Sequence, residues 1–166
     1  VSEFTRGGIK KLDSDILIKA MQVLSTPNGT EGMIGGQVVD IASEGKSISI
    51  DTLKYIHSLK TGAIIRSACV IGAIISGADE SQINAIDEYA INLGIAFQIR
   101  DDILDVTGTA EELGKPIGSD IDLNKSTYVS LCGIEKSVEL VKEYSDKAKD
   151  ALEIFGDKSA FLIEFT

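Results

Sequence analysis

The sequence Phe97-Gln98-Ile99-Arg100-Asp101-Asp102-Ile103-Leu104-Asp105 closes a long apolar run with three carboxylates. On an α-helix, residues four apart share a face, so Asp101 and Asp105 stack and Asp102 flanks them. Like charges at this spacing repel by roughly 0.2–0.5 kcal/mol per pair on an open helix. A cation turns the repulsion into attraction, and Mg2+ suits one or two carboxylates shared with a substrate phosphate. The alternative for these nine residues alone is a solvated acidic helix end.

Lysines in three other places favour the metal site. They occur in Lys60-Thr61-Gly62, in Gly114-Lys115-Pro116-Ile117-Gly118-Ser119-Asp120 and in Asn124-Lys125-Ser126-Thr127-Tyr128. Lysine binds phosphate as a point charge. Each lysine taken alone is typical of a surface residue, but acids and lysines together predict a metal–diphosphate site.

Five blocks of sequence occur in order between residues 32 and 128. They are Gly35-Gly36-Gln37-x-x-Asp40, Lys60-Thr61-Gly62, Phe97-Gln98-x-x-Asp101-Asp102-x-x-Asp105, Gly114-Lys115-x-x-Gly118-Ser119-Asp120 and Lys125-Ser126-Thr127-Tyr128. Together they resemble the C-terminal half of a trans-type polyprenyl (farnesyl/geranylgeranyl) diphosphate synthase. The resemblance implies an all-α helical bundle of the isoprenoid synthase fold. It also implies a prenyltransferase that condenses an allylic diphosphate with isopentenyl diphosphate, assisted by Mg2+.

The resemblance assigns roles to individual side chains. The metal ligands that it implies are Asp101, Asp102 and Asp105. The substrate-binding residues that it implies are Gln37, Asp40, Lys60, Thr61, Phe97, Gln98, Lys115 and Lys125. The catalytic residues that it implies are Lys60, Thr61, Gln98, Asp101 and Asp102. In this scheme metal and lysines stabilise the charge that develops on the departing pyrophosphate, and dry apolar walls protect the allylic cation from water.

One departure from the family pattern limits what the chain does alone. The family carries two aspartate-rich motifs on facing helices, and only the second occurs here. No paired aspartate precedes residue 32, and the single histidine, His57, is interpreted as structural or surface-exposed. We expect the isolated chain to be inactive, with a product length that its sequence does not determine. The alternatives are a catalytically incomplete fragment or non-catalytic subunit with an assembly role, and a terpene cyclase-like enzyme.

Composition excludes some classes of function. The 166 residues are 43 % hydrophobic and 25 % charged, which suits one globular domain with a core. A formal net charge of −10 argues against nucleic-acid binding through a basic surface. Cys69 and Cys132 show no pairing pattern, no targeting segment is visible, and the most apolar run, Ser67–Ala78, is too short to span a bilayer. We therefore expect a soluble, cytoplasmic protein without a membrane span.

Helical periodicity and capping residues organise the chain. Residues 1–12 are expected to form an irregular lead, and residues 13–166 the C-terminal part of a single helical domain. The expected helices cover about 14–25, 30–45, 51–77, 80–107 and 134–155, with shorter pieces at 128–133 and 158–165. The expected caps are Asp13 or Ser14 for the first helix, Asp51 for the third, and Asp79 or Ser81 for the fourth. The polar loop 108–125 contains glycines that are typical of a lid, although a plain connection is the alternative.

Three glycines, Gly32, Gly35 and Gly36, fall inside or beside the expected helix 30–45. Each costs a helix about 1 kcal/mol relative to alanine, so close approach of a neighbouring helix or ligand should compensate. The family places this helix near a two-fold interface. We therefore expect a homo-oligomer, a dimer or a larger assembly, that buries it.

Overall fold

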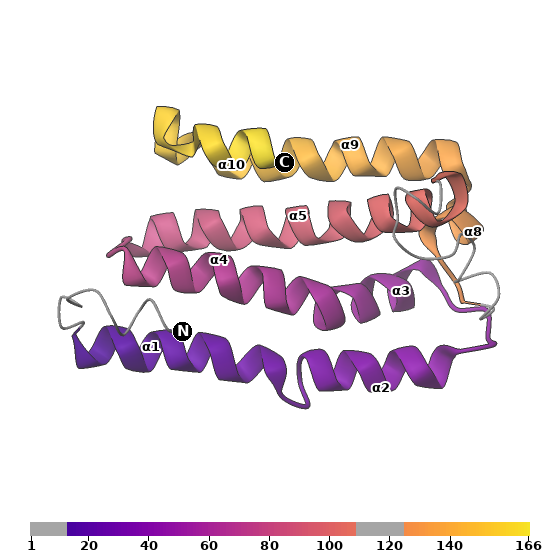
Figure 1. The fold of residues 1–166 in the computed structure, drawn as a ribbon, viewed down its shortest axis with the longest axis horizontal. Helices are drawn as coiled ribbons and strands as arrows, with labels where there is room; N and C mark the ends of the chain where they lie inside the picture. Colours follow the sequence, from indigo (N-terminus) through magenta and orange to yellow (C-terminus); the bar gives the residue numbers. More distant parts are fainter. Residues whose placement is uncertain (1–12, 109–124) are drawn as a thin grey trace.

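The computed structural model describes residues 13–108 and 125–166. In these residues all regular secondary structure is helical, which confirms the predicted all-α class. The helices lie side by side in successive layers (Figure 1). In chain order they are α1 (Ser14–Ser25), α2 (Met33–Ser43), α3 (Ile50–His57), α4 (Ala63–Ile75), α5 (Glu80–Thr107), α8 (Tyr128–Cys132), α9 (Ile134–Ala151) and α10 (Ala160–Phe165). Short helical segments lie at η1 (Thr26–Asn28), η2 (Ser58–Gly62) and η3 (Glu153–Ser159).

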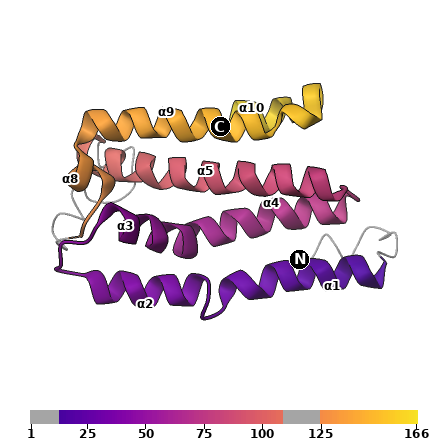
Figure 2. The ribbon, with the colours of Figure 1, turned by 180° about the vertical axis from the view of Figure 1, so that it is seen from behind.

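The order of the layers places α5 in the middle of the bundle, with its acidic C-terminal end at one end of it. Seen from both sides, α1 and α2 form one outer layer, α3 and α4 lie next, and α5 separates these from α9 and α10 (Figures 1 and 2). The C-terminal end of α5 lies at the same end of the bundle as α8, the end of α2 and the start of α3 (Figure 2). Segments far apart in the sequence therefore meet around the three aspartates.

Capping explains where several helices begin. Asp13, one of the two residues expected to cap α1, accepts from the backbone N–H of Asp15 at its start. Asp79, one of the two expected caps of α5, forms a capping box with Gln82. The predicted cap at Asp51 is wrong. Ser49 caps α3 by accepting from the N–H of Thr52 at 3.1 Å, and Asp51 lies in the first turn, where its charge suits the helix N-terminus.

The predicted helix 51–77 is interrupted in its middle. After α3, the π-helical segment η2 carries residues 58–62, and α4 follows directly, inclined to α3 (Figures 1 and 2). Single π-helical turns inside α-helices are frequent at functional sites. Here the segment contains Lys60 and Thr61, two of the predicted site residues.

Gly36 allows α2 to approach this π-helical segment. A Cβ at Gly36 would lie 2.8 Å from the backbone nitrogen of Lys60 and 2.8 Å from the Cβ of Leu59. A Cβ at Gly35 would lie 2.2 Å from the carbonyl oxygen of Thr30. The expected close approach at Gly36 is confirmed, and the neighbour is a segment of the same chain.

Two groups of buried side chains form the core of the bundle. Leu53, Ile99, Ile103 and Tyr128 pack together where α3, α5 and α8 meet. Tyr89, Ala90, Ala148 and Leu152 fill the other end, between α5 and α9. The first group fixes the acidic end of α5 against the segments that carry Lys60 and Lys125.

The stretch Ile50–Ile75 is long and apolar enough to cross a membrane by length and composition, with 22 % of its most apolar window buried in the chain. This stretch overlaps the shorter apolar run 67–78 and extends beyond it toward the N-terminus. Core helices of soluble proteins pass the same test, so one such stretch is weak evidence for a span. In this fold it packs between the outer layer and α5 (Figure 1) and carries Lys60.

Candidate active site

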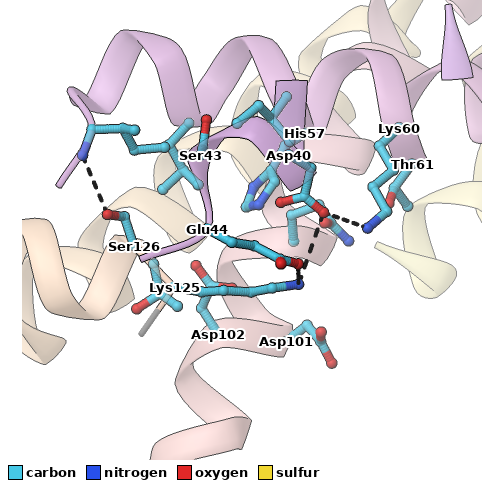
Figure 3. A pocket seen from close by; sticks show the side chains of 15 residues that line it. Asp40, Ser43, Glu44, His57, Lys60, Thr61, Asp101, Asp102, Lys125 and Ser126 are labelled. Atoms are coloured by element: carbon cyan, nitrogen blue, oxygen red, sulfur yellow. Dashed lines mark hydrogen bonds and ion pairs between the residues drawn. The ribbon is translucent and has the colours of Figure 1, made fainter. Parts of the chain in front are cut away.

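A cavity of about 250 Å³ opens where α2, α3, η2, the end of α5 and residues 125–127 meet (Figure 3). Its walls are mostly polar, over an apolar base. The polar residues that line it are Asp40, Ser43, Glu44, His57, Lys60, Thr61, Gln98, Asp101, Asp102, Lys125, Ser126 and Thr127. Ile48, Leu53 and Ile56 form the apolar base. The cavity thus gathers charged groups from four separate parts of the chain.

Two lysines converge on one carboxylate in this cavity. The Nζ of Lys60 lies 2.7 Å from the Oδ2 of Asp40, and the Nζ of Lys125 lies 3.9 Å from the same oxygen (Figure 3). Lys125 also lies 4.0 Å from the Oε1 of Glu44. Both lysine side chains line the cavity and remain partly exposed. A multiply charged anion that entered here would meet both cations at once.

Hydrogen bonds to distant parts of the chain set the position of the segment that carries Lys125. The hydroxyl of Ser126 accepts from the N–H of Ile48 at 3.4 Å and donates to the carbonyl of Lys46 at 3.3 Å. Two residues later, the backbone N–H of Tyr128 donates to the Oδ2 of Asp102 at 2.7 Å. These bonds hold the segment that follows Lys125 against both the α2–α3 connection and α5.

The three aspartates of the acidic motif have different environments. Asp101 lines the cavity and is partly exposed. Asp102 also lines the cavity, but it is only 6 % exposed and accepts from Tyr128. Asp105 is 1 % exposed and is not among the cavity residues. Within residues 13–108 and 125–166, no three His, Cys, Asp or Glu side chains lie close enough together to hold a metal ion. The assignment of all three aspartates as Mg2+ ligands stays a prediction, and the described part of the chain does not bring them together around one point.

The remaining predicted site residues divide between the cavity and other places. Thr61 and Gln98 line the cavity beside Lys60 and Asp101. Gln37 is half-buried on α2, outside the cavity lining. Phe97 is 56 % exposed and lines a separate apolar cavity of about 740 Å³ between α4, α5, α9 and α10. Lys115 and most of the predicted lid 108–125 lie outside the described residues.

Sequence reasoning missed several residues of the cavity. Glu44 lies four residues after Asp40, so the helical repeat places both carboxylates on one face, and this spacing was a usable signal. Ser126 and Thr127 line the cavity as neighbours of Lys125. His57, interpreted as structural or surface-exposed, is half-buried and lines the cavity as well. Burial lowers the pKa of His57 to about 4, so its imidazole is neutral at physiological pH.

Sequence comparison identifies relatives of the chain. Residues 9–158 match the polyprenyl synthetase family. A geranylgeranyl diphosphate synthase from Cyanophora paradoxa is 40 % identical over 162 residues, which is 97 % of this chain and 54 % of the relative. A farnesyl diphosphate synthase from Micrococcus luteus is 42 % identical over 142 residues, which is 86 % of this chain and 49 % of the relative.

Solved structures share the fold. A geranyltransferase from Helicobacter pylori, crystallised with magnesium and isoprenyl diphosphate, is 29 % identical with a TM-score of 0.79 and matches 93 % of this chain and 50 % of its own. An FPP/GFPP synthase from Zymomonas mobilis is 29 % identical with a TM-score of 0.78, over 92 % of this chain and 50 % of its own. The chain spans about half the length of the relatives that it matches. On the sequence match and the shared helical architecture, this chain belongs to the polyprenyl synthetase family.

Proposed function

We propose that this chain supplies the second aspartate-rich motif and the diphosphate-binding lysines of a polyprenyl diphosphate synthase. The reaction condenses an allylic diphosphate with isopentenyl diphosphate in isoprenoid biosynthesis. The observation that carries the proposal is the convergence of Lys60 and Lys125 on Asp40, in a cavity that Asp101 also lines. The names of the relatives, farnesyl and geranylgeranyl diphosphate synthases, support it.

In the proposed reaction, the two lysines bind the diphosphate of the allylic substrate. When the bond between the allylic carbon and the diphosphate oxygen breaks, the electron pair leaves with pyrophosphate, and the ammonium groups stabilise that charge. Thr61 and Gln98 line the same cavity and donate hydrogen bonds to the substrate. The double bond of isopentenyl diphosphate attacks the allylic cation, and loss of a proton completes the new prenyl chain.

The donor set of the cavity fits a metal ion that is shared with the substrate. Asp101 and Asp102 offer hard oxygen donors, and Mg2+ binds through one or two carboxylates while taking its other ligands from water and phosphate. Mg2+ held there by Asp101, with Asp102 beside it, would offset part of the negative charge on the pyrophosphate oxygens.

The proposal includes a requirement for the rest of the catalytic unit. This chain carries one aspartate-rich motif and spans about half of each relative. We therefore propose that the chain alone is inactive. We also propose that the protein is cytoplasmic and forms a homodimer.

A chimera tests this function. The N-terminal half of the Micrococcus luteus relative, joined in register to this chain, should convert geranyl diphosphate and labelled isopentenyl diphosphate into a longer prenyl diphosphate. The same chimera with Asp101→Ala should fold equally well, by circular dichroism, and lose most of this activity. A folded chimera without product would contradict the proposed function, and product from the unjoined chain would contradict the requirement for a second half.

A further inference from the structure

Two aromatic rings meet beneath the candidate active site. His57, the last residue of α3, and Tyr128, the first residue of α8, lie with ring centroids 5.6 Å apart and planes inclined by 46°. The Nδ1 atom of His57 and the hydroxyl of Tyr128 are both buried, and neither has a hydrogen-bond partner in the described part of the chain. A buried polar atom left unpaired is destabilising, and native proteins usually satisfy it with protein or with bound water.

Each residue of the pair is close in sequence to one of the two lysines of the site. His57 precedes Lys60 by three residues, and Tyr128 follows Lys125 by three. Tyr128 is fully buried, and its backbone N–H is bonded to Asp102. The two rings therefore lie on the same two segments of chain as the two lysines.

We propose that one buried water joins the Nδ1 of His57 to the hydroxyl of Tyr128, and that this link fixes the spacing of Lys60 and Lys125 around a bound diphosphate. The inference rests on the proposed function, because it takes these lysines as the diphosphate ligands. His57 and Tyr128 are positioning residues in this scheme. Neither is required to touch the substrate.

The protonation states agree with such a link. Burial lowers the pKa of His57 to about 4. The positive charge of Lys60 also lowers this pKa, whereas the negative charges of Asp40 and Asp101 raise it. Burial also raises the pKa of the Tyr128 hydroxyl. A protonated phenol therefore donates, and a neutral imidazole accepts at Nδ1, which places the imidazole proton on Nε2.

The single histidine of the chain makes the link directly observable, because 15N NMR of the imidazole reports one residue only. We expect the Nε2–H tautomer with a hydrogen-bonded Nδ1. Tyr128→Phe should move the Nδ1 signal of His57 toward that of an acceptor without a hydrogen bond. Tyr55→Phe is the control, because Tyr55 lies on α3 with His57 but is exposed, and it should leave the signal in place. An Nδ1–H tautomer, or an Nδ1 signal that Tyr128→Phe does not move, would overturn the inference.

Binding measurements test the consequence for the site. With Mg2+ present, Tyr128→Phe and His57→Leu should each weaken pyrophosphate binding by roughly three- to tenfold, the range expected for one hydrogen bond. The double variant should bind pyrophosphate no more weakly than the weaker-binding single variant, because either substitution alone already breaks the link. His57→Asn, which returns an acceptor near the Nδ1 position, should restore most of the affinity.

The outcomes separate the link from a general effect on folding and from the proposed function. Additive losses in the double variant, or no rescue by asparagine, would show that the pair does not act as one positioning unit. If the unsubstituted chain fails to bind pyrophosphate with Mg2+, the proposed function fails and takes the role of the link with it, while the NMR comparison still decides whether the link exists.

Discussion

The ammonium of Lys60 lies 2.7 Å from the Oδ2 of Asp40, although the two residues belong to different segments, η2 and α2. Lys125 approaches the same oxygen from a third segment, at 3.9 Å (Figure 3). Asp40 therefore holds two cations at one cavity before any ligand arrives. Such a preorganised arrangement favours an anion that carries more charge than a single carboxylate.

Lys60→Ala should weaken binding of pyrophosphate to the chain. The side chain is 37 % exposed, so solvent screens the interaction, and we expect a loss of about 1 kcal/mol, roughly fivefold in affinity. Lys147→Ala on α9, which removes an exposed lysine paired with Glu143, is the matched control and should have no effect. Calorimetry at constant Mg2+ measures both variants, and equal affinities would argue against Lys60 as a phosphate ligand.

Gly36→Ala should destabilise the fold, since the new Cβ would lie 2.8 Å from the nitrogen of Lys60 and from the side chain of Leu59. Overpacking of this kind costs about 1–3 kcal/mol. Gly72→Ala is the control, because a Cβ there meets nothing within 4 Å and should raise stability by up to about 1 kcal/mol through helix propensity. Urea unfolding distinguishes the two. A neutral Gly36→Ala would show that α2 and η2 tolerate a wider spacing.

The chain should form a homodimer through the outer layer of α1 and α2. Apolar side chains are exposed along both helices, at Leu17, Ile18, Met21, Leu24, Ile34, Val38 and Ile41. A patch of this kind favours association. Val38→Glu should shift the assembly toward monomer in light scattering, while Ile154→Glu, at an equally apolar exposed position on η3, should not. A monomer at micromolar concentration before any substitution would disprove the interface.

Val38 tests the interface better than the glycines of the same helix do. A substitution at Gly35 would not test this interface, because a Cβ there would lie 2.2 Å from the carbonyl oxygen of Thr30 in the same chain. Its substitution would disturb the local fold before it disturbed any interface. The glycines of α2 are explained within this chain, so the exposed apolar surface is the argument that remains for association.

Stability should decrease as the pH falls from about 6.5 toward 4 because of His57. Its pKa is lowered to about 4 in the folded chain, mainly by burial, while the unfolded chain keeps a value near 6.5. Between these values the unfolded state binds more protons, so acid favours unfolding. His57→Phe keeps a ring but removes the titration. The difference between urea midpoints at pH 7 and pH 5 should be smaller in this variant, and an unchanged difference would contradict a neutral, buried His57.

The sequence predicted the parts of the fold that depend on local interactions. Asp13 and Asp79 bond to backbone groups two or three residues away, and both helix starts were predicted correctly. The π-helical turn at η2 was not predicted, because the apolar repeat continues through it and its altered hydrogen bonding leaves no compositional mark. Long-range contacts were equally inaccessible. Asp102 is turned toward Tyr128, 26 residues away, and no spacing along the helix could have indicated this partner.

The position of a residue around its helix explains which of the predicted site residues line the cavity. Asp101 and Gln98 are three residues apart on α5 and both line the cavity. Phe97 precedes Gln98 by one residue, about 100° around the helix, and faces a different cavity. Phe97 and Gln98 are adjacent in the family motif, but the helix points their side chains into different cavities. Glu44 shows the opposite case, because its spacing from Asp40 contained the information and was not used.

The central claim is that the cavity is a diphosphate site whose metal is shared with the ligand. Calorimetric titration of Mg2+ into the chain, with and without pyrophosphate, tests it most directly. The account predicts weak Mg2+ binding to the chain alone, clearly tighter binding in the presence of pyrophosphate, and loss of this difference in Asp101→Asn. Tight Mg2+ binding without pyrophosphate, or pyrophosphate binding that neither Mg2+ nor Asp101→Asn changes, would contradict it.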